Sequence, residues 1–132
     1  MKRNGILNVQ LMQYITGLGH TDTFLIGDAG MPVPKGVPIV DLVLTGGIPT
    51  FEQVLKAVLA ETKIEFYTIA EDTKTVNPRV YALLADELPG VQREEIPHVE
   101  LKKMTQNCKF AIRTGEFTPY SNVVLRAGCV FN

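Results

Sequence analysis

The sequence lacks any long uninterrupted apolar segment. No stretch approaches the roughly 18 apolar residues that a membrane-spanning helix needs. The N-terminus, MKRNGILNVQLMQYITGLGH, mixes Asn and Gln among its apolar positions, so it lacks the unbroken apolar core of a signal peptide. We therefore expect a cytoplasmic protein that does not associate with membranes.

A surplus of positive charge is also missing. The 13 Lys and Arg residues nearly balance the 14 Asp and Glu residues, which leaves a net charge of -1. Because a phosphate-binding surface needs excess cationic side chains, we expect no nucleic-acid partner. The 132 residues are 45% hydrophobic and 20% charged, which is ordinary for a globular protein with one core. We expect a single domain over residues 1–132.

Cysteine is scarce, and several catalytic motifs are absent. Cys108 and Cys129 form no C-x-x-C pair, so we expect a reducing compartment and two small buried side chains. The sequence contains no G-x-G-x-x-G and no P-loop, which excludes the common nucleotide-binding motifs. Neither cysteine occupies an electropositive turn, and no serine lies in a strand-turn-helix elbow, so nucleophilic catalysis is disfavoured.

What the chain does contain is an alternation of strand-like and helix-like segments. The apolar patterns predict strands over 23–27, 39–45, 64–70, 91–97, 110–114 and 122–131. They predict helices after an Asn8 cap, after Pro49, over 78–88 and over 98–106. Such alternation favours an α/β layered fold with a mostly parallel central sheet and helices on its faces.

Polar residues gather in three clusters near the ends of predicted strands. His20, Asp22 and Asp28 flank the first strand, and His98 follows a weaker one. The third cluster is RTGEFTPYSN, residues 113–122, which places many hydrogen-bonding side chains on a rigid turn. Because ligands of α/β sheets bind beyond the carboxyl ends of strands, these clusters predict a site for a polyhydroxylated ligand.

The residue types alone leave the roles of these side chains open. His20 can act as a general acid or base near neutral pH, or it can simply stabilise the preceding helix C-terminus as a cation. Asp28 can orient a histidine or bind sugar hydroxyls, or it can form an ordinary Asx turn. His20, Asp22 and His98 are possible metal-ligand types, but they lack a recognised spacing, so we expect no metal site.

Four segments are more distinctive as sequences than the chemistry of their individual side chains would require. They are KRNGILN, GLGHTDTFLIGDAGMPVP, IVDLVLTGGIPTF and IPHVELKKMTQNCKFAIRTGEFTPYSNVVLRAGCVF. In order and spacing they resemble the D-ribose pyranase family of sugar mutarotases, which is related to the fucose mutarotases. The resemblance runs from residue 2 to the C-terminus. Its sharpest parts, GHTD…DAGxPxP and IRTGExTPYxN, are too long and too polar to reflect packing alone.

The resemblance implies an α/β enzyme that interconverts the pyranose and furanose forms of ribose without a cofactor. It implies that His20 is the proton donor. It also implies a set of sugar-binding residues, namely Asp28, His98, Tyr120, Ser121 and Asn122. Members of this family assemble into rings, commonly decamers of two pentamers, with sites formed between neighbours, so a homo-oligomer is expected.

The implied chemistry suits these side chains. Ring opening adds a proton to the ring oxygen and removes one from the anomeric hydroxyl, and reclosure through another hydroxyl changes the ring size. We assign His20 as the acid, Asp28 as its orienting or sugar-binding partner, and His98 as a second contact that could act as the base. Two alternatives remain: a non-catalytic sugar-binding or transport-associated module, and a fucose-type mutarotase that changes only the anomeric centre.

Overall fold

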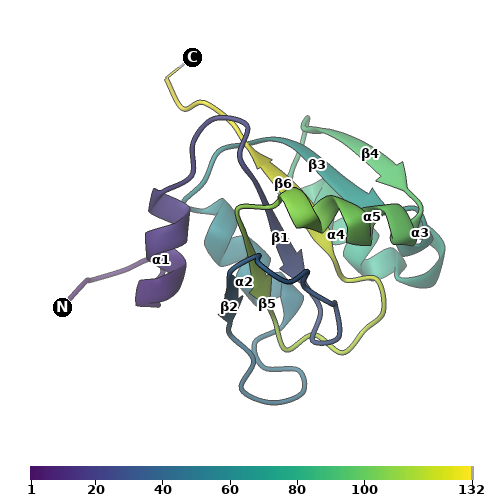
Figure 1. Cartoon of the computed structure of the whole chain (residues 1–132), viewed down its shortest axis with the longest axis horizontal. Coiled ribbons are helices and arrows are strands. Elements are labelled where there is room, and N and C mark those ends of the chain that lie inside the picture. Colours follow the sequence, from purple (N-terminus) through teal and green to yellow (C-terminus); the bar gives the residue numbers. More distant parts are fainter. Residues whose placement is uncertain (132) are drawn as a thin grey trace.

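The chain forms one six-stranded sheet flanked by helices (Figure 1); the structure is a computed structural model that describes residues 1–131. The strands are β1 (Thr23–Gly27), β2 (Ile39–Asp41), β3 (Ile64–Ala70), β4 (Gln92–Ile96), β5 (Phe110–Arg113) and β6 (Val123–Ala127). The helices are α1 (Val9–Thr16), α2 (Phe51–Leu59), α3 (Asp72–Val76), α4 (Pro78–Glu87), α5 (His98–Met104) and the 3-10 turn η1 (Thr105–Asn107).

The sheet is mostly parallel, as predicted. Its strand order is β2-β5-β1-β6-β3-β4. The pairs β2 with β5, β5 with β1 and β3 with β4 are parallel, whereas β6 is antiparallel to both β1 and β3. Every strand except β6 therefore runs in one direction. The carboxyl ends of five strands lie at one edge of the sheet, which we call the carboxyl edge; we call the opposite edge the amino edge.

Helices cover both faces of the sheet, which explains the continuous apolar run in β1. Phe24 and Ile26 pack with α1, α2 and α4, whereas Leu25 packs on the other face with α5. Because successive strand side chains point to opposite faces, a strand covered on both sides needs apolar residues at every position. The predicted α/β fold class is confirmed.

Two helix starts show how local sequence sets the elements. Asn8 caps α1 as predicted, with its Oδ1 accepting a hydrogen bond from Leu11 N at 2.9 Å. The helix expected to open at Pro49 instead begins after Thr50. The Thr50 hydroxyl accepts from Gln53 N at 3.1 Å and Gln53 Oε1 accepts from Thr50 N at 2.9 Å. This capping box fixes the first turn and leaves Pro49 outside the helix.

Other boundaries differ from those expected. The strand predicted over 39–45 ends at Asp41, whose Oδ1 accepts a hydrogen bond from Val43 N at 3.1 Å and turns the chain. The strand predicted over 122–131 ends at Ala127. The short polar helix α3 was not expected, because it offers almost no apolar periodicity. Across residues 1–131, no helix combines the length and apolar character that crossing a membrane requires.

Candidate functional site

A pocket opens at the carboxyl edge, where the loops that follow β1 and β4 meet the loop before β6. Its volume is about 320 Å³, which is ample for a monosaccharide. Four of the residues predicted to bind a sugar line it, namely Asp28, His98, Tyr120 and Asn122. The other lining residues are Gly30, Met31, Pro32, Lys102 and Pro119. The fold thus brings together side chains as far as 94 positions apart in the chain.

Asp28 and Asn122 form a reciprocal pair at the pocket. Asn122 Oδ1 accepts a hydrogen bond from Asp28 N at 2.9 Å, and Asn122 Nδ2 donates to Asp28 Oδ2 at 3.1 Å. Asp28 Oδ1 accepts from Gly30 N at 2.9 Å, so the Asx turn is also present. Burial raises the pKa of Asp28, while these hydrogen bonds oppose the rise. The pair holds a carboxylate in one orientation, ready to accept hydrogen bonds from hydroxyl groups.

His98 begins α5 and presents an unsatisfied nitrogen. Its ring meets that of Tyr120 edge to face, with 5.0 Å between centroids. The Nδ1 atom is buried and has no hydrogen-bond partner within residues 1–131. Burial lowers the pKa of His98, and the nearby Lys102 ammonium lowers it further, against the opposing effect of Asp28. The lowered pKa therefore favours the neutral imidazole near pH 7.

Tyr120 and Ser121 differ in what they expose. Tyr120 adopts the left-handed backbone region, with φ of 57°, and a hydrogen bond with Asp72 raises the pKa of its hydroxyl. Ser121 is fully buried and does not line the pocket. Its Oγ accepts from Asn77 Nδ2 at 3.0 Å and lies 2.7 Å from Thr118 Oγ1. The structure places this side chain inside the loop, and its part in sugar binding stays a prediction.

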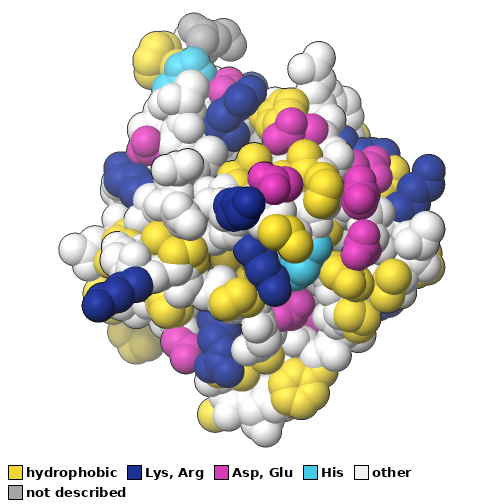
Figure 2. Space-filling view, turned by 45° about the vertical axis from the view of Figure 1, so that its right-hand side comes forward, with side chains coloured by type: hydrophobic (Ala, Val, Ile, Leu, Met, Phe, Trp, Pro, Cys, Tyr) yellow, Lys and Arg dark blue, Asp and Glu magenta, His cyan; other side chains and the backbone are white. Residues whose placement is uncertain are grey.

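His20 lies away from this pocket within one chain. It precedes β1, whereas Asp28 follows it, so the five residues of the strand separate them by about 16 Å. Figure 2 shows the two histidines of the chain well apart. His20 Nε2 lies 3.0 Å from Glu65 Oε2, and Arg126 Nε donates to Glu65 Oε1 at 3.1 Å. A single chain therefore does not place the predicted acid beside the predicted sugar-binding residues.

Asp22 shares the amino edge with His20 and serves the local structure. Its Oδ2 accepts from Gly19 N at 2.7 Å and from Lys109 Nζ at 3.0 Å, and these two contacts lower the pKa of Asp22. The predicted cluster of His20, Asp22 and Asp28 is therefore two separate sets of side chains. The error arose because a strand puts its two flanking segments at opposite edges of the sheet.

Lys102 is a pocket residue that the sequence motifs do not single out. It lines the pocket together with His98 and lies four positions after it on α5. Residues at this spacing share one face of a helix, so the i, i+4 relation to His98 was the available signal.

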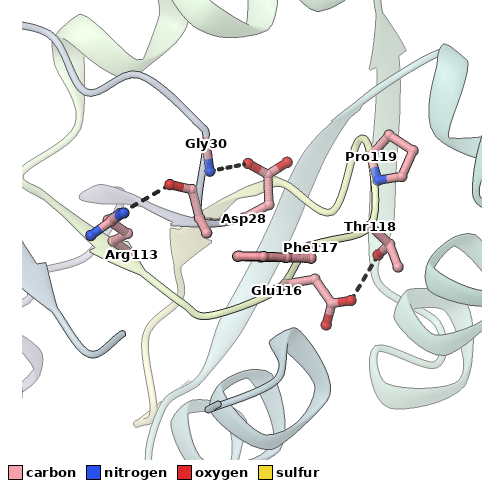
Figure 3. A pocket seen from close by; sticks show the side chains of 8 residues that line it. Asp28, Gly30, Arg113, Glu116, Phe117, Thr118 and Pro119 are labelled. Atoms are coloured by element: carbon pink, nitrogen blue, oxygen red, sulfur yellow. Dashed lines mark hydrogen bonds between the residues drawn. The ribbon is translucent and has the colours of Figure 1, made fainter. Parts of the chain in front are cut away.

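A second, wider hollow of about 490 Å³ adjoins the pocket (Figure 3). It shares three lining residues with the pocket, namely Asp28, Gly30 and Pro119. Arg113 Nε donates to Ala29 O at 3.0 Å, and Thr118 Oγ1 donates to Glu116 Oε2 at 2.8 Å. These contacts hold the loop after β1 and the loop before β6 in place beside the pocket.

The described residues offer no obvious metal or thiolate chemistry. Within residues 1–131, no group of three or more His, Cys, Asp or Glu side chains is placed to hold a metal ion. Cys108 is buried, as predicted, and burial raises the pKa of its thiol to about 11. Cys129 is half-buried. The polar groups of the pocket remain the strongest chemical feature at the carboxyl edge.

The fold and pocket define a class: an α/β protein that can hold a small polar molecule at the carboxyl edge of a mostly parallel sheet. The chain belongs to the RbsD / FucU transport protein family, whose model matches residues 1–130. This match, together with relatives named D-ribose pyranase, confirms the predicted family. The chain is 45% identical over 131 residues to a D-ribose pyranase of Clostridium novyi (strain NT), covering 99% of this chain and 100% of the relative. It is 47% identical over 131 residues to a D-ribose pyranase of Bacillus licheniformis, with the same coverage.

Solved structures agree with this family. The structure of Bacillus subtilis RbsD complexed with D-ribose matches with a TM-score of 0.96 and 40% sequence identity, covering 99% of this chain and 100% of that one. The fucose mutarotase from Streptococcus pneumoniae in complex with L-fucose matches with a TM-score of 0.81 and 15% identity, over 94% of each chain. The second likeness shows a shared fold alone.

Proposed function

We propose that this protein is a D-ribose pyranase, which interconverts the pyranose and furanose forms of ribose by acid and base catalysis. One observation carries the proposal. Asp28, His98, Tyr120 and Asn122 converge on a monosaccharide-sized pocket in a chain 40% identical to an RbsD structure complexed with D-ribose. Relatives named D-ribose pyranase match over 99% of the chain. The reaction transfers neither electrons nor a chemical group, so it needs no cofactor.

The pocket binds the sugar through complementary polar groups. The Asp28 carboxylate accepts hydrogen bonds from hydroxyls, and the second N–H of Asn122 Nδ2 is free to donate to one. The neutral His98 ring lines the pocket beside these two groups. Because a sugar that lacks a matching hydroxyl leaves one of these groups unpaired, the set favours a particular sugar over its analogues. His98 is the proton acceptor that suits the anomeric hydroxyl.

The acid comes from a neighbouring copy of the chain in this proposal. His20 lies at the amino edge and the pocket at the carboxyl edge, so a head-to-tail contact brings His20 of one copy to the pocket of the next. Repeated head-to-tail contacts close into a ring when the rotation allows it. A homo-oligomeric ring, either a pentamer or two stacked pentamers as the family resemblance implies, supplies one acid to each pocket.

Glu65 orients this acid. A carboxylate only accepts hydrogen bonds, so the contact with Glu65 Oε2 makes Nε2 of His20 the donor. The other nitrogen, Nδ1, then carries a proton only in the imidazolium form. The protonated ring therefore has one N–H held by Glu65 and one free to reach the ring oxygen of ribose. Arg126 holds Glu65 in turn at 3.1 Å.

Saturation-transfer NMR on equilibrated ribose tests the proposal. The protein should speed exchange between pyranose and furanose signals. Ribose binding without faster exchange would instead support a non-catalytic sugar-binding module. Faster exchange between α and β anomers with unchanged ring-size exchange, stronger for fucose than for ribose, would support a fucose-type mutarotase.

A further inference from the structure

The loop over residues 114–122, between β5 and β6, carries three pocket residues, Pro119, Tyr120 and Asn122. Tyr120 and Asn122 line the pocket, whereas the loop's one large apolar side chain, Phe117, is 75% exposed. Tyr120 packs against the apolar cluster around Leu25 and Leu101, and the rest of the loop needs other contacts to keep a single conformation. Several of those contacts are hydrogen bonds from α3, α4 and the residue that joins them, and others come from Gly27, Asp28 and Phe51.

Asn77, between α3 and α4, makes three hydrogen bonds to this loop. Its side chain is buried, and Nδ2 donates to Thr118 Oγ1 at 3.0 Å, to Pro119 O at 2.9 Å and to Ser121 Oγ at 3.0 Å. Its Oδ1 accepts from Val80 N at 3.3 Å, which caps α4. One amide therefore links the N-terminus of α4 to three groups of the loop.

These bonds surround the least favourable backbone conformation of the loop. Tyr120 has a φ of 57°, a region that costs free energy for a residue with a side chain. Asn77 holds the residues on both sides of it, Pro119 and Ser121. Thr73 Oγ1 of α3 donates to Tyr120 O itself at 3.1 Å. The strained turn therefore persists because its polar groups are fixed at three successive residues.

A buried carboxylate supports the same arrangement from the other side. Glu116 Oε1 accepts from Phe51 N, the first residue of α2, at 2.9 Å. Its Oε2 accepts from Arg79 Nη2 at 3.2 Å and from Thr118 Oγ1 at 2.8 Å. The Thr118 hydroxyl thus donates to Glu116 while it accepts from Asn77. Every donor in this cluster has an acceptor, which gives the loop one preferred geometry.

We infer that Asn77 is a positioning residue for the sugar site: its amide holds residues 118–121 so that Tyr120 and Asn122 face the pocket. The inference rests on the proposed function for the meaning of the site. Asn77 itself does not line the pocket. Its effect on catalysis passes through the loop, and the loop's conformation can be measured without any sugar.

Asn77→Asp is the primary test. Aspartate caps a helix as well as asparagine does, so α4 keeps its cap, but the new side chain has no N–H to give the loop. We expect the KM for ribose to rise roughly tenfold or more, with a smaller change in kcat. Hydrogen exchange should accelerate in peptides that cover residues 114–122 and stay unchanged over residues 78–87.

Two further variants make the result decisive. Asn8→Asp makes the same atom exchange at the α1 cap, where Asn8 Oδ1 accepts a hydrogen bond from Leu11 N. It should leave both the KM and the hydrogen exchange of residues 114–122 unchanged. Asn77→Ser also keeps a cap but is too short to reach the loop, and it introduces no charge. It should reproduce the effect if Asn77→Asp fails to fold.

The outcomes separate this inference from the proposed function. A wild-type KM together with wild-type exchange of residues 114–122 in Asn77→Ser would overturn the positioning role. Accelerated exchange spread equally over α4 would overturn it too, because the residue would then act only as a helix cap. If the wild-type protein binds ribose without interconverting its ring forms, the proposed function fails. The inference is then still tested by the ribose affinity of the Asn77 variants and by the hydrogen exchange of residues 114–122.

Discussion

At the scale of single residues, burial and three charged side chains, Lys102, Asp28 and Asp72, set the pKa of His98. Burial is the largest cause of its lowered pKa, and the Lys102 ammonium is the next. Lys102→Met removes that cation, so we expect the pKa of His98 to rise toward its usual value of about 6.5. The chemical shift of the His98 ring proton against pH measures this directly.

Lys103→Met is the matched control for this titration. Lys103 belongs to the same helix but pairs with Glu100 at 3.4 Å, and it is absent from the residues that line the pocket. The control should leave the pKa of His98 nearly unchanged. An equal rise in both variants would show that Lys102 acts only as part of the overall charge of α5.

The same lowered pKa predicts how stability depends on pH. Between the folded-state and unfolded-state pKa values of His98, the unfolded chain binds more protons than the folded one. The contribution of His98 to the free energy of unfolding therefore falls as pH drops below about 6.5. His98→Gln should flatten this dependence in urea unfolding experiments at pH values on either side of 6.5. If the free energy of unfolding of His98→Gln depends on pH as steeply as that of the wild type, the lowered pKa of His98 is not the cause of the dependence.

Glu65 gives a second prediction at this scale. Glu65→Gln keeps the side-chain length but replaces the carboxylate that accepts a hydrogen bond from His20 Nε2 with an amide. We expect kcat to fall roughly tenfold with little change in KM, because the acid, not the pocket, is altered. Glu52→Gln, which changes an exposed ion pair with Lys56, should leave both constants unchanged. A change confined to KM would contradict the orienting role.

The identities of most pocket residues can be predicted from the sequence, whereas the placement of their side chains cannot. Asp28, His98, Tyr120 and Asn122 are polar residues at strand ends, and polar groups there face clefts or water. Lys102 was not predicted as a pocket residue, because exposed lysines are common on helix surfaces. The burial of Ser121 could not be read from the sequence, since it depends on Asn77, which is 44 positions away in the chain.

At the scale of elements, α5 positions two pocket residues through its buried face. Leu101 lies between His98 and Lys102 on the helix and is 0% exposed. Leu101→Ala should lower the free energy of unfolding by about 2–5 kcal/mol, because it leaves a cavity beneath the helix. Val99→Ala, at a position that is 61% exposed, should change it by less than about 0.5 kcal/mol. Urea unfolding of both variants provides the comparison, and equal losses would contradict the assigned burial.

The sequence predicts the elements well where apolar patterns are long. The run in β3 and the periodic apolar face of α4 are typical of a covered strand and an amphipathic helix, and both were found where expected. The sequence predicts helices and strands poorly where local hydrogen bonds set their ends. Asp41 ends β2 through its own side chain, and α3 follows from chain connectivity and contact with the loop rather than from apolar spacing.

At the scale of the whole molecule, the separation of His20 from the pocket is the most consequential feature. The sequence does not show at which edge of the sheet a segment next to a strand lies. His20, Asp22 and Asp28 were therefore predicted as one cluster. The fold places them at opposite edges, and the proposed ring brings them together between copies. Large apolar side chains such as Leu44 and Phe117, 78% and 75% exposed, are available for contacts between subunits.

The most direct measurement is ribose exchange by saturation-transfer NMR on rings co-expressed from His20→Ala and Asp28→Asn subunits. Each variant alone should show little exchange, because every site lacks its acid or its carboxylate. Random co-assembly in equal amounts pairs an intact His20 with an intact Asp28 at about a quarter of the interfaces, so about a quarter of wild-type exchange should return. Mixed rings, verified by native mass spectrometry, that recover no exchange would contradict a site shared between neighbouring copies.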